Sequence, residues 1–472
     1  MFLAQKRHVS LEQADNRYTR GIAEFVSRLE YDTIPEEVRE RIKFLILDAL
    51  GCGLYGADLE WSRILQRRLG ELDTTQWCVV WGTRQKLSAP HAALINGTQV
   101  QGFELDDVHR VGVLHTGCVV LPALISIAET RRGVTGKQFL AAAVAGYEIG
   151  PRVSICMGPE HIAQGWHSGA TVGVFAAAAG AARALRLDAD KTVHALGIAG
   201  TQASGLMAAQ FGSMVKRMHA GRASQSGLYG AQFAHSGLTG ITNVFESEYG
   251  GFCTTFSRSH DRFKLEELTA GLGSVWQTMG VRLKFYSCVG SNHSTLDAIR
   301  EIMRERAVRT DEIIKIVVHG SQVTVDHVGW KYVPQGFTAA QLNLSYCVAT
   351  LLIDGEVFVD EFAEDKLTDP ARMALAHKVV VLHDPAITAL GPKLRQMVRV
   401  EIHLNDGTRM KRTREVSLAK EKFASADEIV AKFDKLAARV LPESRVRELR
   451  DAVLNLEQLN DAARLAQLLA RR

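Results

Sequence analysis

The sequence lacks the cysteine patterns that mark a metal site or a disulfide framework. Its 7 cysteines are scattered over 472 residues, with no Cys-x-x-Cys motif and no His/Cys spacing typical of zinc sites. Scattered cysteines of this kind are typical of reduced thiols in a reducing compartment. We therefore expect a cytoplasmic protein with free thiols.

Long apolar runs and long runs of one charge are missing as well. The apolar stretch at the N-terminus is too short for a signal peptide. The most apolar segment, residues 169–185, is mostly Ala and Gly, includes Arg183, and is too short to span a bilayer. Lys and Arg (56) nearly balance Asp and Glu (52), giving a net charge of +4. We therefore expect neither a membrane nor a nucleic acid as a partner.

Helical periodicity dominates the first part of the chain, whose hydrophobic content of 46% is ample for two or three domains. Residues 35–50 form one predicted helix, which Gly51 and Gly53 are expected to close. Further helices are predicted over residues 11–30, 119–129, 137–150, 168–187 and 189–209. Many of these are rich in Ala and Gly, which lets helix axes approach closely and predicts a compact all-helical domain.

The pattern changes after about residue 275. Residues 313–328, 378–384 and 396–404 are rich in β-branched residues and alternate, as strands do, and Asp406-Gly407 is typical of a hairpin turn. Residues 339–355 predict a helix, and Ser425 is expected to cap another. The sequence thus predicts a mainly α fold. An all-α domain (residues 1–275 and 415–472) carries an inserted α+β lid domain (residues 276–414).

Acidic and imidazole side chains crowd into residues 102–117, between two apolar stretches. Within twelve positions stand Glu104, Asp106, Asp107, His109 and His115. Burying so many ionisable groups costs desolvation energy, so this density indicates a functional site.

Four further stretches repeat this pattern of polar residues in apolar surroundings. They are GWHSGATVG with His167, GSMVKRMHAGRASQSG with Lys216 and His219, LKFYSCVGSNHSTLDA with Lys284 and His293, and LNLSYCVATLLIDG with Tyr346. Together with residues 102–117, these five blocks in this order resemble the MmgE/PrpD family over nearly the whole chain. That family includes 2-methylcitrate dehydratase, cis-aconitate decarboxylase and iminodisuccinate epimerase.

The resemblance implies a polar pocket whose catalytic residues are Asp107, His115, His167, Lys216, Lys284 and Tyr346. We expect substrate contacts from Asp106, His109, His219, Arg222 and His293. It also implies a homodimer and no cofactor. The lack of clean ligand spacing, with cations beside the acid–histidine cluster, predicts that no metal is needed. In this interpretation the lysines bind a small carboxylate substrate, His115 or His167 transfers the α proton, and Asp107 orients one of these histidines.

The resemblance implies a lyase, of the dehydratase type, that acts on a small di- or tricarboxylate by abstracting an α proton. An epimerase of an iminodisuccinate-like acid is the alternative, since both reactions share that first step. Three positions depart from many relatives: Glu104 replaces an Asp, Val108 a Thr and Thr116 a Pro. These departures bear on the substrate more than on the fold.

Each residue also has a simpler interpretation. Asp106 and Asp107 could cap a helix, His115 and His167 could pack in the core, and Tyr346 could fill the core with its hydroxyl satisfied. The cations, including Arg222, could form a solvated face.

Three other classes of protein fit the sequence less well. A metal-dependent hydrolase could use Asp106, Asp107, His109 and His115 as ligands, but the neighbouring lysines argue against it. A helical scaffold would not need five polar blocks. Residues 196–205 lack the glycine spacing of a dinucleotide site.

Overall fold

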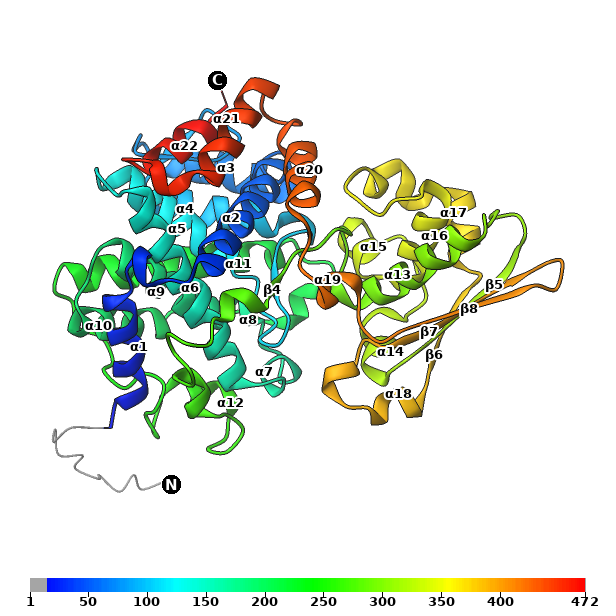
Figure 1. Ribbon diagram of the computed structural model, residues 1–472, viewed down its shortest axis with the longest axis horizontal. Coiled ribbons are helices and arrows are strands. Elements are labelled where there is room, and N and C mark those ends of the chain that lie inside the picture. The colour runs from blue at the N-terminus through cyan, green and yellow to red at the C-terminus, as the bar shows by residue number, and fades with distance from the viewer. Residues whose placement is uncertain (1–14, 472) are drawn as a thin grey trace.

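Helices packed through small residues make up most of the structure (Figure 1). The computed structural model describes residues 15–471, with 59% of residues in helices and 8% in strands. The predicted mainly α fold with a small sheet domain is therefore confirmed. Within the described residues, no helix is both long and apolar enough to cross a membrane.

One group of helices, which we call the helical body, is formed by the first half of the chain together with its last three helices. Its members are α1 (Arg17–Arg28), α2 (Glu36–Gly56), α3 (Glu60–Leu72), α4 (Ala89–Val100), α5 (Gly117–Thr130), α6 (Gly136–Met157), α7 (Glu160–Ala163), α8 (Ser168–Thr171), α9 (Gly173–Ala184), α10 (Ala189–Gly200), α11 (Val215–His235), α12 (Phe252–Ser257), α20 (Ala426–Ala437), α21 (Glu443–Leu454) and α22 (Ala463–Leu469). Two short antiparallel ribbons join it, β1 (Cys78–Val79) with β2 (Lys86–Leu87) and β3 (Val108–His109) with β4 (Val281–Arg282).

A four-stranded sheet with its helices forms the second unit, which we call the sheet domain. The strand order is β6-β5-β7-β8, with β5 and β6 parallel and the other pairs antiparallel. Its elements are α13 (Gly290–Glu305), β5 (Ile313–Gly320), α14 (Gln322–Val328), α15 (Phe337–Leu342), α16 (Leu344–Asp354), α17 (Pro370–Ala376), β6 (Val379–His383), α18 (Pro385–Ala389), β7 (Val398–Leu404) and β8 (Arg409–Arg414), followed by the connecting α19 (Leu418–Glu421). Helices α13 and α16 pack on the sheet. The domain boundaries near residues 275 and 415 stay a prediction.

Two local predictions in the sheet domain have different outcomes. The Asp406-Gly407 turn does join β7 to β8, with Gly407 at φ 84°, as a tight hairpin requires. The predicted strand over residues 313–328, however, ends at Gly320. Ser321 caps a helix there by accepting a hydrogen bond from the Thr324 amide, so its capping chemistry outweighs the β-branched composition that follows.

The two glycines expected to close the helix of residues 35–50 lie inside α2 instead. A Cβ on Gly53 would lie 2.7 Å from the Trp81 ring, and one on Gly51 would lie 3.2 Å from the ring of Phe433 in α20. The glycines therefore serve close packing, which outweighs their low helix propensity, and the helix continues to Gly56.

Helix α20, one of the last three helices of the chain, packs against α2, which is far from it in sequence (Figure 1). Lys432 in α20 forms a buried ion pair of 2.5 Å with Asp48 in α2, and its Nζ donates a 2.7 Å hydrogen bond to the carbonyl oxygen of Leu105. Ser425 caps α20 as predicted and forms a capping box with Glu428. Helix α20 thus holds the backbone of the acid-rich loop, by which we mean residues 102–117.

The body and the sheet domain also meet through aromatic rings next to this loop. Phe103 stacks edge-on against Tyr55 of the body, with ring centroids 5.0 Å apart, and against Phe337 of the sheet domain at 4.5 Å. Trp61 contacts Phe337 as well, at 5.6 Å. These contacts position both units around residue 104.

We predict that Lys432→Met destabilises the fold by about 3–5 kcal/mol, because it leaves Asp48 buried without its counter-ion. Lys435→Met is the matched control on the same helix, since Lys435 pairs with Glu356 at the surface. Its effect should stay within about 1 kcal/mol. Chemical denaturation followed by circular dichroism measures both. Equal effects of the two substitutions would contradict the importance of the buried pair.

Candidate active site

The centre of the site is Glu104, a buried carboxylate with three cationic partners. The Nζ of Lys216 forms a very short ion pair with its Oε1. Arg217 Nη1 lies 2.7 Å from the same oxygen, and Lys284 Nζ lies 3.1 Å from Oε2. All four residues are buried, with less than one-tenth of their surface exposed. Burial alone would raise the pKa of Glu104, but the three cations outweigh it and hold the pKa well below its usual range.

Three separate elements bring these cations to Glu104. Helices α4 and α11 approach closely because glycines face each other, and a Cβ on Gly97 would lie 2.7 Å from the Cα of Gly221. This contact brings the start of α11, with Lys216 and Arg217, to the loop that follows α4. Lys284 follows the short strand β4, whose pairing with β3 fixes it beside the same loop.

The backbone of Glu104 is in an unusual conformation. Its φ is 56°, in the left-handed region that residues other than glycine seldom adopt, at a cost of about 1–3 kcal/mol. Such a conformation persists only where surrounding contacts fix it, and the three ion pairs of the side chain provide them. Backbone strain of this kind concentrates at functional sites.

A second pair in the same loop joins Asp106 to His115. The His115 Nδ1 lies 3.1 Å from Asp106 Oδ2, and Asp106 is fully buried. Burial would raise the pKa of Asp106, but His115 and Lys284 outweigh it and lower the pKa. Because an ionised carboxylate only accepts hydrogen bonds, Nδ1 of His115 carries the proton, and Nε2 is left to exchange a proton with a substrate.

The expectation that Asp107 orients a histidine is therefore wrong, because Asp106 takes that position. Asp107 accepts hydrogen bonds from the amides of Thr116 and Gly117, both at 3.0 Å, and so caps the start of α5. Burial raises the pKa of Asp107 and the neighbouring Asp106 raises it further, to about 7. The two adjacent carboxyl groups thus differ in charge over much of the acidic range.

Two more of the predicted histidines form a pair. His167 Nδ1 and His219 Nδ1 lie 3.1 Å apart, so one ring donates its Nδ1 proton to the other. Burial lowers the pKa of His167, and Lys216 and His219 lower it further, well below its usual value. Burial and Lys216 also lower the pKa of His219. Both rings are therefore neutral near pH 7, beside the cation cluster.

Four predicted residues make other contacts instead. The Tyr346 hydroxyl donates to the carbonyl of Glu361 at 3.1 Å, and its ring packs on Tyr332 and Phe362. His293 Nε2 donates to the carbonyl of Cys288 at 3.1 Å. For Tyr346 this is the core interpretation that the sequence left open.

The other two of these four have local partners as well. Arg222 is exposed on α11 and donates a hydrogen bond to Gln225. It lies six residues after Lys216, a spacing that places it on another face of the helix. His109 Nδ1 accepts from the Gly112 amide at 2.9 Å, and burial lowers its pKa to about 4.

Three residues of the candidate site, Glu104, Arg217 and Gln341, are not among the catalytic and substrate-binding residues predicted from the sequence. Gln341 of α15 accepts from Arg217 at 3.1 Å and donates to the carbonyls of Phe103 and Ser287, both at 2.9 Å. Glu104 could have been found, because it lies within the acid-rich stretch of residues 102–117. No sequence pattern marks Arg217 or Gln341 as part of the site, because they meet only through a long-range contact.

The arrangement bears on the metal-dependent hydrolase considered above. Its four proposed ligands point to different partners: Asp107 to backbone amides, His109 to Gly112, and Asp106 to His115. Among the residues described, no three His, Cys, Asp or Glu side chains gather as a ligand set. The geometry thus gives this alternative no support.

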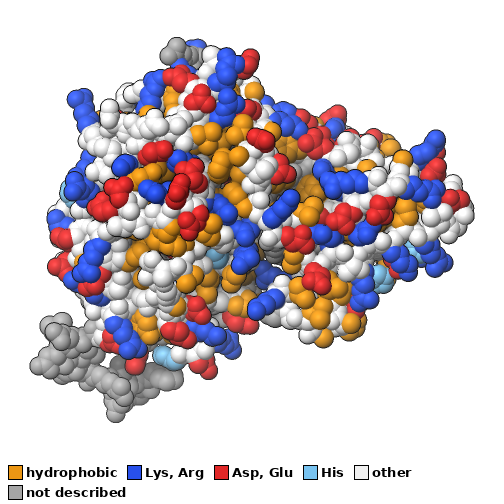
Figure 2. Space-filling model, viewed as in Figure 1, with side chains coloured by type: hydrophobic (Ala, Val, Ile, Leu, Met, Phe, Trp, Pro, Cys, Tyr) orange, Lys and Arg blue, Asp and Glu red, His pale blue; other side chains and the backbone are white. Residues whose placement is uncertain are grey.

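A cavity of about 330 Å³ lies beside the cluster, between the body and the sheet domain. His327 lines it and also hydrogen-bonds to Ser291 Oγ at 3.0 Å. On the face shown in Figure 2, Lys and Arg side chains lie around the hollow between the two units.

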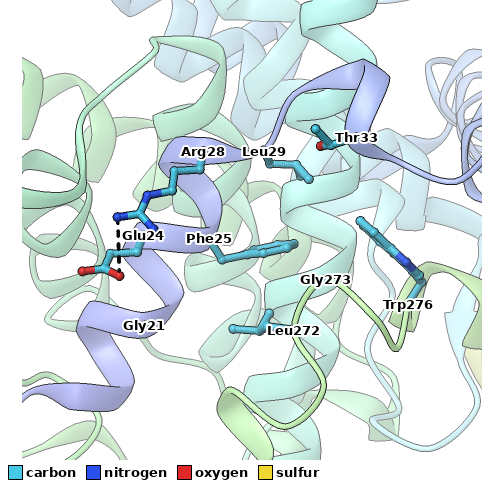
Figure 3. A pocket seen from close by; sticks show the side chains of 9 residues that line it. All are labelled: Gly21, Glu24, Phe25, Arg28, Leu29, Thr33, Leu272, Gly273 and Trp276. Carbon is cyan, nitrogen blue, oxygen red and sulfur yellow. Dashed lines mark ion pairs between the residues drawn. The ribbon is translucent and has the colours of Figure 1, made fainter.

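A second cavity, of about 370 Å³, lies in the helical body beside α1 (Figure 3). Its charged residues Glu24 and Arg28 pair with each other at 3.9 Å, and Phe25 lies against Trp276 with centroids 6.3 Å apart. Its lining contains no histidine or lysine. Its one carboxylate, Glu24, is paired with Arg28, so the cavity offers no cluster of cations for a polycarboxylate.

Comparison with known proteins gives matches along almost the entire chain. The MmgE/PrpD N-terminal domain matches residues 20–264, and the MmgE/PrpD C-terminal domain matches residues 286–458. The cis-aconitate decarboxylase-like protein oryM of Aspergillus oryzae is 35% identical over 97% of this chain and 98% of its own. A cis-aconitate decarboxylase of Aspergillus terreus is 36% identical over 97% and 96%. The human cis-aconitate decarboxylase is 26% identical over 96% and 94%.

The raised pKa of Asp107 predicts a pH dependence of stability. Between about pH 4 and about pH 7 the folded protein keeps a proton that the unfolded chain releases, so this group makes stability fall as pH rises. The slope is on the order of 1.4 kcal/mol per pH unit. In Asp107→Asn this contribution is lost, so between about pH 4 and about pH 7 the slope of unfolding free energy against pH becomes more positive than in the wild type.

Asp188→Asn is the matched control for this experiment. Asp188 also caps a helix, α10, by accepting from the Lys191 amide at 2.8 Å, but it is exposed. Its substitution should leave the wild-type slope unchanged. Denaturant titrations at a series of pH values give the slopes, and equal slopes for wild type and Asp107→Asn would rule out the raised pKa.

Proposed function

Because this chain belongs to the MmgE/PrpD family, we propose that it is a lyase that decarboxylates a small unsaturated tricarboxylate of the cis-aconitate type. The cis-aconitate decarboxylases to which it is similar support this reaction over the carbon–oxygen lyase expected from the motif. The observation that carries the proposal is the buried cluster of Lys216, Arg217 and Lys284 beside the Asp106–His115 pair.

The charge balance of this cluster suits an anionic substrate. Three cations stand against the two carboxylates of Glu104 and Asp106, so the balance is positive, and it rises further when His115 is protonated. Glu104 holds the ammonium and guanidinium groups in place before substrate arrives. Groups oriented in advance stabilise developing charge without a cost of reorganisation at the moment of reaction.

Decarboxylation requires two things of these residues. When the bond to the departing carboxyl group breaks, CO₂ leaves and the electron pair stays on the carbon skeleton, where the remaining unsaturated carboxylate spreads it. The cations stabilise this charge, and a proton must then reach carbon. His115 is the best donor, because Asp106 holds its Nδ1 at 3.1 Å and leaves Nε2 to exchange a proton, whereas His167 and His219 are paired with each other through their Nδ1 atoms.

The other reactions considered for the family differ in their products. Dehydration and epimerisation both start with the removal of a proton from carbon, and they stay predictions that the assay below distinguishes. A homodimer, a cytoplasmic location and independence of cofactors stay predictions as well.

The test is to incubate the purified protein in deuterated water with cis-aconitate, with a citrate-type hydroxy acid and with an iminodisuccinate-like dicarboxylate, each in a separate reaction, and to follow CO₂ and the products by NMR. We expect release of CO₂ and one deuteron on carbon in a five-carbon dicarboxylate. Loss of water from a citrate-type acid with no CO₂ would instead make the enzyme a dehydratase. Exchange of a proton for deuterium in an otherwise unchanged dicarboxylate would make it an epimerase.

The role of His115 gives a second prediction. His115→Gln should lower kcat by about a hundredfold or more, because the proton donor is lost, while the melting temperature changes little. His235→Gln is the matched control, since His235 is exposed at the end of α11. A His115→Gln enzyme with near-native kcat would exclude His115 as the donor.

Lys284 is expected to bind a substrate carboxylate. Lys284→Met keeps the length of the side chain but removes its charge, and it should raise KM by about one to two orders of magnitude. Arg222→Met removes an exposed charge from the same protein and should leave KM unchanged. Steady-state kinetics on both variants separates a contact with substrate from a change in overall charge, and similar KM values would refute the assignment.

A further inference from the structure

The cavity between the body and the sheet domain is lined mostly by apolar surface. One side comes from the body, just before α11, and the other from α14, α15 and the segment between them. The lining residues are Gln210, His327, Trp330, Gln335, Ala339 and Leu342. A small polycarboxylate has no apolar part that would fill such a space.

Helix α15 places this cavity directly beside the cations. Thr338 and Gln341, one turn apart, face Arg217, with contacts of 3.5 and 3.1 Å. Ala339 and Leu342 follow each of them by one residue and so form the neighbouring face, which lines the cavity. One side of the helix thus supports the carboxylate-binding cluster while the next side borders the cavity.

His327 is a second link between the cavity and the cluster. Its ring lines the cavity, and burial together with the charge of Lys216 lowers its pKa. The imidazole is therefore neutral near pH 7 and adds no charge to the cavity wall.

We propose that the cavity holds an alkyl substituent of the substrate, so that the preferred substrate is an unsaturated tricarboxylate bearing a chain of several carbons. This inference rests on the proposed decarboxylation for the nature of the charged part. The cluster around Glu104 binds the carboxylates, and the chain extends along α15 past Ala339 and Leu342. An apolar cavity of about 150 Å³ is enough for a benzene ring, so about 330 Å³ accommodates at least six carbons.

Two measurements on the wild-type protein test the proposal. The first is kcat/KM for cis-aconitate and for analogues substituted with methyl, propyl and hexyl chains. The second is calorimetric binding of 2-alkylsuccinates of the same chain lengths, which does not depend on turnover. We expect both kcat/KM and affinity to rise by about fourfold for each methylene buried, until the cavity is full.

Two substitutions then locate the effect in the cavity. Ala339→Leu fills space there and should lower the ratio of kcat/KM for the hexyl analogue to that for cis-aconitate by at least tenfold. Leu342→Ala enlarges the cavity and should move the best chain length upward. Ala386→Leu is the matched control, because Ala386 is exposed on α18, and it should keep the wild-type ratio.

The outcomes separate this inference from the proposed function. Turnover of cis-aconitate with equal kcat/KM and equal affinity across the series would overturn the inference alone. Absence of turnover with any tricarboxylate, but affinity that rises with chain length, would overturn the decarboxylation and support the assignment of the cavity. A chain-length preference that Ala339→Leu and Leu342→Ala both leave unchanged would place the chain elsewhere and refute the proposal.

Discussion

The ion pairs of Glu104 are the interaction on which the site depends. One carboxylate in a strained backbone conformation joins Lys216 and Arg217 of the body to Lys284 at the edge of the sheet domain. Removing the charge of Glu104 would leave three buried cations without compensation, which is costly in a low-dielectric environment. Glu104 therefore keeps three mutually repelling cations together in a buried position.

The sequence predicted the elements of this architecture better than their contacts. The mainly α fold, the Asp406-Gly407 hairpin and the Ser425 cap followed from local patterns, because periodicity and turn chemistry act over a few residues. The prediction that the glycines of α2 end the helix was wrong. They allow Trp81 and Phe433, from distant parts of the chain, to pack closely against the helix. Single-sequence patterns carry no signal for such packing.

The same limit applies to the candidate site. The sequence located the acid-rich loop and both lysines, but it could not tell which of two adjacent carboxylates faces His115, because that depends on the direction of one turn of chain. Neither could it show that Arg217 is buried, since an arginine on a helix is usually solvated. In the structure Asp107 caps α5 and the Tyr346 hydroxyl donates to a backbone carbonyl, as the simpler interpretations predict, whereas Lys216 and Lys284 lie in the cluster around Glu104.

Because Lys432 anchors the acid-rich loop, the order in which the chain is synthesised matters for this loop. The loop, both lysines of the cluster and the whole sheet domain are made before α20, which supplies the hydrogen bond to Leu105 and the partner of Asp48. A nascent chain thus carries every group of the cluster while the loop still lacks its support. The loop can therefore gain this support only after residues 426–437 have been synthesised.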